Sequence, residues 1–216
     1  MEIENITQIL ILTHVGFGGI ALISGAISMI AKKGNWYHKK SGKVFYYALL
    51  TSALISLVVS LIPNHQSPFF FCLGLFSLYF IIGGYRSLTF KIKNASLWLD
   101  KIIACLIILV GLTMMIYPIL LNGKINIVLF YFGAVSIVFG VIDLLLFQNS
   151  NKTKRNWLNI HLTKMIGAYL VAATAFVVNQ SFLGIWSWFL PTIIGNIYLF
   201  YWLIKLNRKK TADNNV

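Results

Sequence analysis

Acidic residues are scarce in this chain. Only five of its 216 residues are aspartate or glutamate, against 18 lysines and arginines, and charged residues of both signs make up 11% of the sequence. Hydrophobic residues make up 58%. Because a single soluble core of this size could not bury so much apolar surface, the composition excludes a soluble globular protein. We therefore expect lipid to be the solvent of most of the chain.

Cysteine and sequence motifs for catalysis are also lacking. The two cysteines, Cys72 and Cys105, lie in apolar stretches near opposite faces, which predicts no disulfide and two small buried hydrophobic side chains. The sequence has no glycine-rich phosphate loop, no HExxH, CxxC or GxSxG, and no lysine midway through its last apolar run that could bind retinal. These absences leave nucleotide-dependent, zincin-type, serine-hydrolase and retinal chemistry without support.

Seven apolar runs are each long enough to cross the hydrocarbon core of a bilayer, which takes about 20 helical residues. They cover residues 8–31, 44–62, 68–88, 102–121, 125–147, 158–179 and 185–204. The residues before the first run include Glu2 and Glu4 and no basic residue, so we expect a retained span and no cleaved signal peptide. The prediction is an all-α, polytopic seven-helix bundle in one domain, residues 1–210, with a disordered tail at 211–216.

Basic residues indicate the orientation of these spans. Sixteen of the 18 lie in four segments at or just beyond the ends of the first, third, fifth and seventh runs. They are Lys32, Lys33, Lys39, Lys40 and Lys43; Arg86, Lys91, Lys93 and Lys101; Lys152, Lys154 and Arg155; and Lys205, Arg208, Lys209 and Lys210. The positive-inside rule therefore predicts an outside N-terminus and a cytoplasmic C-terminus in a bacterial cytoplasmic (inner) membrane. The net charge of +13 then fits anionic lipid headgroups, and we expect no binding of nucleic acid.

Five ionisable residues gather, in depth, near the predicted cytoplasmic face: His38, Arg86, Asp143, His161 and Lys164. A charge inside a span is costly unless it has a partner or lines a cavity. One interpretation is a polar pocket for a small ligand or metal, in which Arg86 and Lys164 hold an anionic group and the histidines exchange protons or ligate metal. The other is that Asp143 pairs with Arg86 or Lys164 only to hold helices together.

Further candidates flank this set. Met165 shares a helix face with His161, which suits either a soft-metal ligand pair or close helix packing. Tyr85 precedes the arginine that closes the third run, and His14 lies about two turns into the first run among glycines.

A haem would need two axial ligands at one depth. His14 and His161 lie in opposite leaflets and cannot share an iron, since each residue advances a helix by about 1.5 Å. A two-haem arrangement would pair His14 with His65 and His161 with His38, taking two ligands from loops. Haem or a metal ion thus remains an open, less favoured expectation.

The sequence resembles a bacterial family of multipass membrane proteins of unknown function along nearly its whole length. The resemblance rests on His14-Val15-Gly16-Phe17, Gly25, His38-Lys39-Lys40-Ser41-Gly42-Lys43, Gly84-Tyr85-Arg86, Asp143, His161 to Tyr169, Thr174-Ala175-Phe176, Asn179 and Leu190 to Gly195. Lys164 stands where the family has arginine, which keeps the charge but would weaken a bidentate anion contact. The resemblance implies topology and candidate residues, and no activity.

Several functions therefore stay open. The favoured one is an integral membrane protein that binds a small ligand or metal near the cytoplasmic face. A haem-binding redox protein is one alternative. A solute transporter with three-plus-one-plus-three topology is another, suggested by equal spacings in His38, Tyr46, Thr51 and in His161, Tyr169, Thr174. An intramembrane metal hydrolase would need a second buried acid that the spans do not supply.

Overall fold

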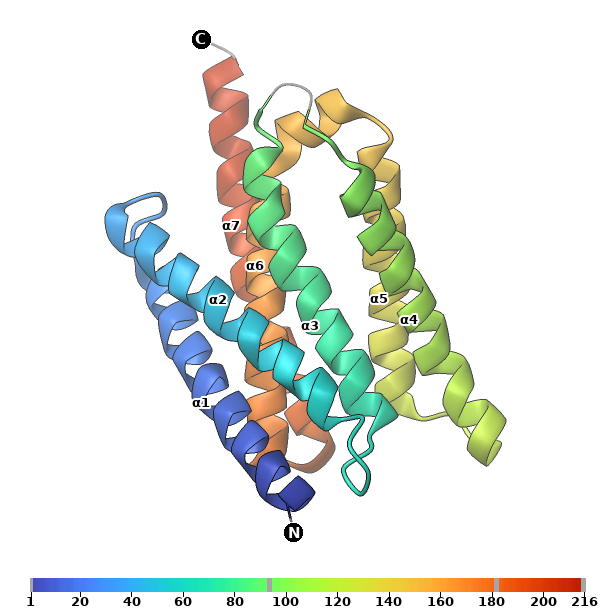
Figure 1. Cartoon of the computed structure of the whole chain (residues 1–216). Coiled ribbons are helices and arrows are strands. Elements are labelled where there is room, and N and C mark those ends of the chain that lie inside the picture. Colours follow the sequence, from blue (N-terminus) through green and yellow to red (C-terminus); the bar gives the residue numbers. More distant parts are fainter. Residues whose placement is uncertain (1, 93–94, 181–182, 215–216) are drawn as a thin grey trace.

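The computed structural model describes residues 2–92, 95–180 and 183–214, and these ranges form helices and no strand (Figure 1). The helices are α1 (Glu2–Ile30), α2 (Trp36–Val59), α3 (Pro68–Arg86), η1 (Ser87–Thr89), α4 (Trp98–Asn122), α5 (Ile127–Phe147), α6 (Ser150–Asn179), η2 (Gly184–Trp188) and α7 (Leu190–Asn214). Across these ranges, seven helical segments are long and apolar enough to cross a membrane. The predicted all-α architecture with seven candidate spans is confirmed.

Helix ends differ from the apolar runs because capping side chains, and not hydropathy, decide where a helix begins. The side chain of Asn35 accepts a hydrogen bond from the backbone N–H of His38 at 2.8 Å and starts α2 at Trp36. His38, which the charge pattern assigned to a loop, therefore lies in the first turn of a helix. At the other end of the chain α7 continues to Asn214, so residues 211–214 of the predicted disordered tail are helical, while 215–216 lie outside the described residues.

The helices form two hairpins, α1–α2 and α4–α5, on either side of a central pair, α3 and α6. The α1–α2 hairpin packs on α3 through α2, the α4–α5 hairpin contacts both α3 and α6, and α7 packs on α6 (Figure 1). α1 packs closely along α2, whereas α5 contacts α6 only sparsely. A three-plus-one-plus-three repeat would make these two pairs equivalent, so the pairing of helices gives that topology no support.

Aromatic side chains fill the core between α3, α5 and α6. Phe76, Phe80 and Phe132 are almost fully buried, and their rings meet edge to face at centroid distances of 4.8 Å (Phe76–Phe80) and 5.9 Å (Phe76–Phe132). Gly167 on α6 leaves room for the ring of Phe80, because a Cβ at Gly167 would overlap that ring. This packing fixes the central pair of helices against α5.

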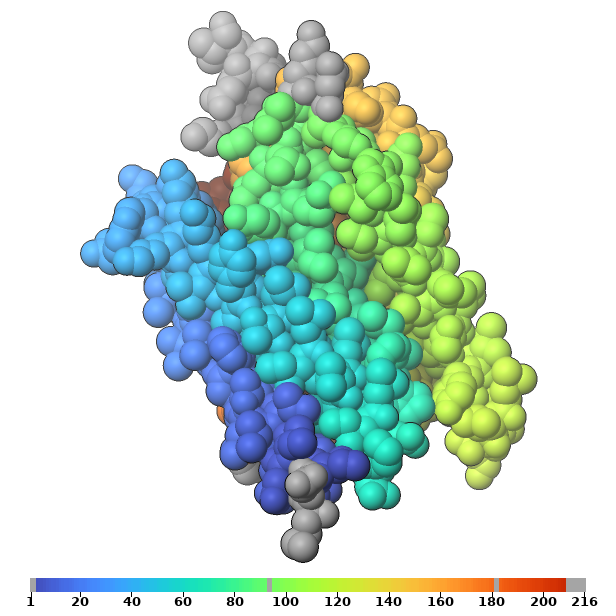
Figure 2. Space-filling view, in the orientation of Figure 1, coloured from blue at the N-terminus to red at the C-terminus, as the bar shows by residue number. Residues whose placement is uncertain are grey.

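The outer surface of the bundle is apolar, as lipid contact requires. Figure 2 shows one such face, formed by α1, α2, α3 and α4. Leu12, Ile23 and Leu120 are each about two-thirds exposed or more (71%, 67% and 77%). Cys105 on α4 is also exposed and Cys72 is only half-buried, so the expectation of two buried thiols is wrong; both are free, as predicted.

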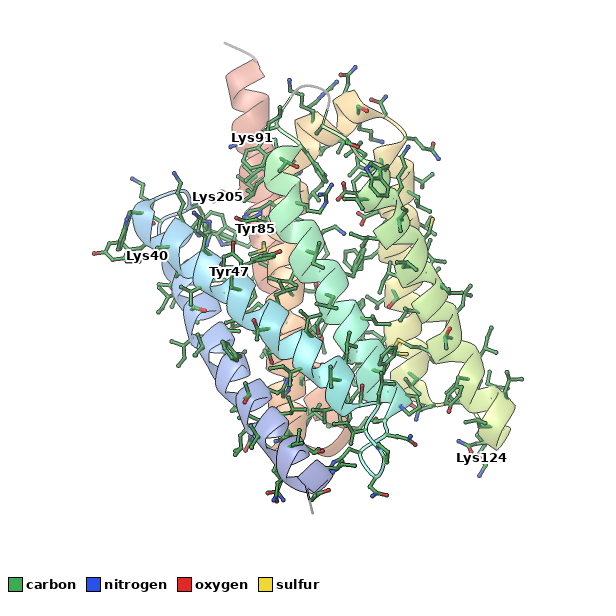
Figure 3. The ribbon with its side chains drawn as sticks, viewed as in Figure 1. Lys40, Tyr47, Tyr85, Lys91, Lys124 and Lys205 are labelled. Carbon is green, nitrogen blue, oxygen red and sulfur yellow. The ribbon has the colours of Figure 1, made fainter. Side chains whose placement is uncertain are left out.

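One end of the bundle carries most of the basic residues. Figure 3 shows Lys40, Lys91 and Lys205 toward this end and Lys124 at the other. We call it the basic end; it comprises the α1–α2 turn, the C-terminal ends of α3 and α7, and the α5–α6 turn. Here the α1–α2 hairpin leans away from α6 and α7 (Figure 1).

Candidate functional site

A buried ion pair joins α5 and α6. Lys164 Nζ donates to Asp143 Oδ2 at 2.5 Å, and the side chains of the two residues are only 5% and 7% exposed. The hydroxyl of Tyr79 on α3 donates to the same carboxylate oxygen at 2.6 Å, and the Lys164 ammonium lies 3.7 Å from the centroid of the Tyr79 ring. The expectation that Asp143 lies near Lys164 or Arg86 is confirmed for Lys164.

Tyr79 was not predicted from the sequence as a partner of Asp143, although its spacing from Gly83 could have indicated it. Tyr79 precedes Gly83 by four residues, so the two share one face of α3. The Lys164 side chain runs along Gly83, where a Cβ would overlap it. On this helix face Gly83 thus leaves room for the Lys164 side chain, and Tyr79 donates a hydrogen bond to the carboxylate of Asp143. The three side chains connect three helices, which suits a structural role.

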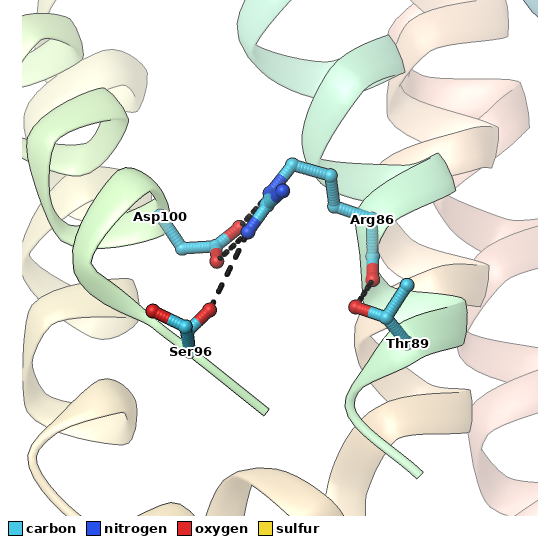
Figure 4. Close-up of polar contacts among 4 residues, drawn as sticks. All are labelled: Arg86, Thr89, Ser96 and Asp100. Carbon is cyan, nitrogen blue, oxygen red and sulfur yellow. Dashed lines mark hydrogen bonds and ion pairs between the residues drawn. The ribbon is translucent and has the colours of Figure 1, made fainter. Parts of the chain in front are cut away.

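A second ion pair joins α3 and α4. Arg86 Nε donates to Asp100 Oδ1 at 2.8 Å and Arg86 Nη2 to Asp100 Oδ2 at 2.7 Å (Figure 4). The Asp100 side chain is 3% exposed and that of Arg86 28%. Arg86 also donates to the Ser96 carbonyl at 3.5 Å. Arg86 is therefore not a partner of Asp143. The apolar-run boundaries left Asp100 in a basic loop, which hid it as the partner of Arg86.

A cavity of about 510 Å³ lies at the basic end, among α1, α2, the C-terminal end of α3 with η1, α6 and α7. Its walls are largely apolar and aromatic, with Phe45, Trp157, Tyr169 and Trp202 among them. Figure 2 shows the surface hollowed between the α1–α2 turn and the end of α3, with part of α7 behind. The volume falls in the range of about 300–1,000 Å³ that small-molecule sites occupy.

The predicted pocket is thus divided in two. Two of the five predicted pocket residues, His38 and His161, line the cavity, as do the flanking candidates Tyr85 and Met165. Arg86, Asp143 and Lys164 do not line it, and each takes part in an ion pair. The five predicted residues therefore do not share one pocket, because depth in the membrane does not fix direction. Lys164 and Met165 are consecutive, yet they point about 100° apart around α6.

The two cavity histidines share one hydrogen-bonding arrangement. His161 Nδ1 lies 2.8 Å from the Gly84 carbonyl oxygen, and His38 Nδ1 lies 2.9 Å from the Ser28 carbonyl oxygen. A carbonyl oxygen only accepts hydrogen bonds, so Nδ1 is the donor in both rings; His38 Nδ1 also lies 3.1 Å from the Ser28 hydroxyl oxygen. In the neutral form of either ring, Nε2 then carries the lone pair. Within the described ranges, neither Nε2 atom has a hydrogen-bond partner.

His14 and His65 do not meet. His14 Nδ1 lies 2.9 Å from the Ser52 carbonyl oxygen and bonds α1 to α2. His65 Nε2 lies 3.4 Å from a carboxylate oxygen of Glu4, on the surface of the opposite end. The pairing of these two histidines in a second haem site therefore has no support, and His14 is an interhelical contact.

A bare metal ion finds few ligands. The part of the chain that the structure describes contains no group of three or more His, Cys, Asp or Glu side chains placed to hold a metal. No protein-family model, curated protein or solved structure matches the chain. The resemblance to the bacterial family therefore stays a prediction, and function rests on the site alone.

Proposed function

We propose that this protein is a multipass membrane protein that binds an anionic, amphipathic molecule in the cavity at the basic end. The observation that carries the proposal is the pairing of apolar walls with unneutralised lysines. Lys39 and Lys43 lie one turn apart on α2 and both line the cavity. In the described structure neither side chain has a hydrogen bond, ion pair or aromatic contact. An anionic headgroup would supply their missing partner.

The other lysines of the cavity are already engaged. Lys33 donates to the Met29 carbonyl and to the Tyr198 hydroxyl, and Lys91 lies over the Trp157 ring. Their aliphatic stems add to the apolar wall.

Three carboxylates whose side chains the structure describes do not offset this charge. Asp100 and Asp143 are bound to their own basic partners, and Glu4 lies at the opposite end against His65. The cavity therefore has a positive potential over low-dielectric walls, which favours an anion with an apolar body.

Orientation is the first part of this proposal to test. We expect the basic end to face the cytoplasm of a bacterial inner membrane, because that end carries nearly all lysines and arginines. Reporter fusions near Lys40 and Lys154 should report a cytoplasmic location, and fusions near Asn64, Asn122 and Gln180 an outside one. A cytoplasmic Gln180 would contradict the seven-span topology.

Ligand binding is the second part. Detergent-purified protein should bind fluorescent phosphatidylglycerol, and the double variant Lys39→Gln/Lys43→Gln should bind it about tenfold or more weakly, since each cation near an anionic headgroup contributes about 1 kcal/mol. Leu158→Trp, which adds bulk to the cavity wall, should also weaken binding. The matched control is Lys124→Gln, at the opposite end. Equal binding by all variants, or an equal loss in Lys124→Gln, would refute the cavity as the site.

A further inference from the structure

The geometry points to a haem as the molecule that the cavity is built to hold, with the Nε2 atoms of His38 and His161 as its axial ligands. This inference rests on the proposed function and names the ligand within its class. A haem is a flat apolar macrocycle with two carboxylates, so it is itself an anionic amphiphile. The protein would supply the axial ligands, the apolar walls and the cations.

The hydrogen bonds of the two imidazoles carry the first step. A histidine that ligates a metal commonly donates its other ring N–H to a backbone carbonyl, which fixes the tautomer and orients the ring. His38 and His161 both do so, and both leave Nε2 without a hydrogen-bond partner in the described ranges. They come from different helices, α2 and α6, and line the same cavity. His14 makes a similar bond but does not line the cavity, so the shared cavity distinguishes the pair.

The number of ligands carries the second step. A bare metal ion needs three or four protein ligands, and no such group exists among the described residues. Haem iron brings four nitrogens of its own and needs only two axial ligands. A lipid would use the lysines and the apolar walls but would have no use for two oriented imidazoles. Haem is the class of ligand that uses every feature of the site.

The lysines and glycines carry the third step. Lys39 follows His38 directly and Lys43 lies one turn further along α2, so the unpaired cations stand beside one axial ligand, where carboxylates of the macrocycle could reach them. Gly25 and Gly42 line the same cavity. A Cβ at Gly25 would overlap the Tyr169 ring, and a Cβ at Gly42 would lie 3.3 Å from the Ser28 hydroxyl oxygen. Gly25 faces the ring of Tyr169, which brings an aromatic wall close to α1.

Absorption spectroscopy tests the inference. The full chain is expressed with a haem precursor, purified in detergent, and titrated with hemin where it emerges without haem. We expect one haem per chain, a Soret band, and on reduction the sharp α and β bands of a six-coordinate low-spin iron. His38→Ala and His161→Ala should each abolish the six-coordinate low-spin spectrum. His14→Ala is the matched control and should leave it unchanged.

Two further measurements keep the outcome decisive. Met165→Leu tests the other soft ligand in the cavity: if this variant loses the low-spin spectrum and His38→Ala keeps it, the assigned ligands are wrong. Near-infrared magnetic circular dichroism on unmodified protein distinguishes bis-histidine from histidine–methionine ligation, so the test stands even if a histidine variant fails to fold. A wild-type protein that gains no haem spectrum overturns the inference. If that protein still binds phosphatidylglycerol through Lys39 and Lys43, the proposed function stands; if it binds neither, both fail.

Discussion

Lys164→Met should lower the free energy of unfolding by about 3–5 kcal/mol, the range found when one partner of a buried ion pair is removed. The variant leaves the Asp143 carboxylate in a site where its side chain is only 7% exposed, and the Tyr79 hydroxyl is then its one remaining hydrogen-bond partner in the described structure. The lipid around the bundle supplies no water that could solvate this carboxylate. Titration with SDS in mixed micelles, followed by circular dichroism, measures the change.

The double variant Asp143→Leu/Lys164→Met decides whether the pair has a purely structural role. Because a buried ion pair often stabilises no more than apolar side chains of similar size, the double variant should recover most of the lost stability. It should also keep ligand binding, since neither residue lines the cavity. Lys124→Met, at an exposed loop, should change stability little. A double variant that folds stably but no longer binds ligand would show that the ion pair belongs to the functional site.

Gly133→Ala should destabilise the α4–α5 hairpin, although alanine is the better helix former by about 1 kcal/mol. The added Cβ would lie 2.7 Å from the Gly111 carbonyl oxygen. In the same way, Gly111→Ala would place a Cβ 2.6 Å from the Gly133 carbonyl oxygen. Backbone atoms cannot move aside by changing rotamer, so α4 and α5 must separate. We expect a net loss of about 1–3 kcal/mol from Gly133→Ala, and a larger loss from Gly111→Ala/Gly133→Ala.

Gly19→Ala provides the matched control for this experiment. A Cβ at Gly19 meets no atom within 4 Å, so the variant should be neutral or slightly more stable. The same SDS titration compares the three variants. If Gly133→Ala proved as stable as Gly19→Ala, the close approach of the α4 and α5 backbones would be wrong.

The same packing explains how the cavity keeps its shape. The α4–α5 hairpin and the Tyr79, Asp143 and Lys164 contact hold α3, α5 and α6 together, while the α1–α2 hairpin reaches this group mainly through α3. At the basic end the α1–α2 hairpin diverges from α6 (Figure 1). Residues of the hairpin and of α6 line the cavity there.

Hydropathy and charge along the sequence were sufficient to predict the seven helices and to place the basic residues at alternate turns. They also predicted that Asp143 needs a cationic partner, because the cost of an isolated charge in lipid does not depend on which helix supplies that partner. Positions along the helix axis could thus be derived from the sequence alone.

The direction in which each side chain points around its helix axis could not be derived from the sequence. In lipid the outward faces are as apolar as the inward ones, so the hydrophobic pattern does not tell which side of a helix meets its neighbours. Only the tertiary structure therefore decided that Lys164 turns to Asp143, that Arg86 turns to Asp100, and that His161 turns the other way, into a cavity shared with His38. The separation of two ion pairs from the ligand cavity follows from how the helices pack.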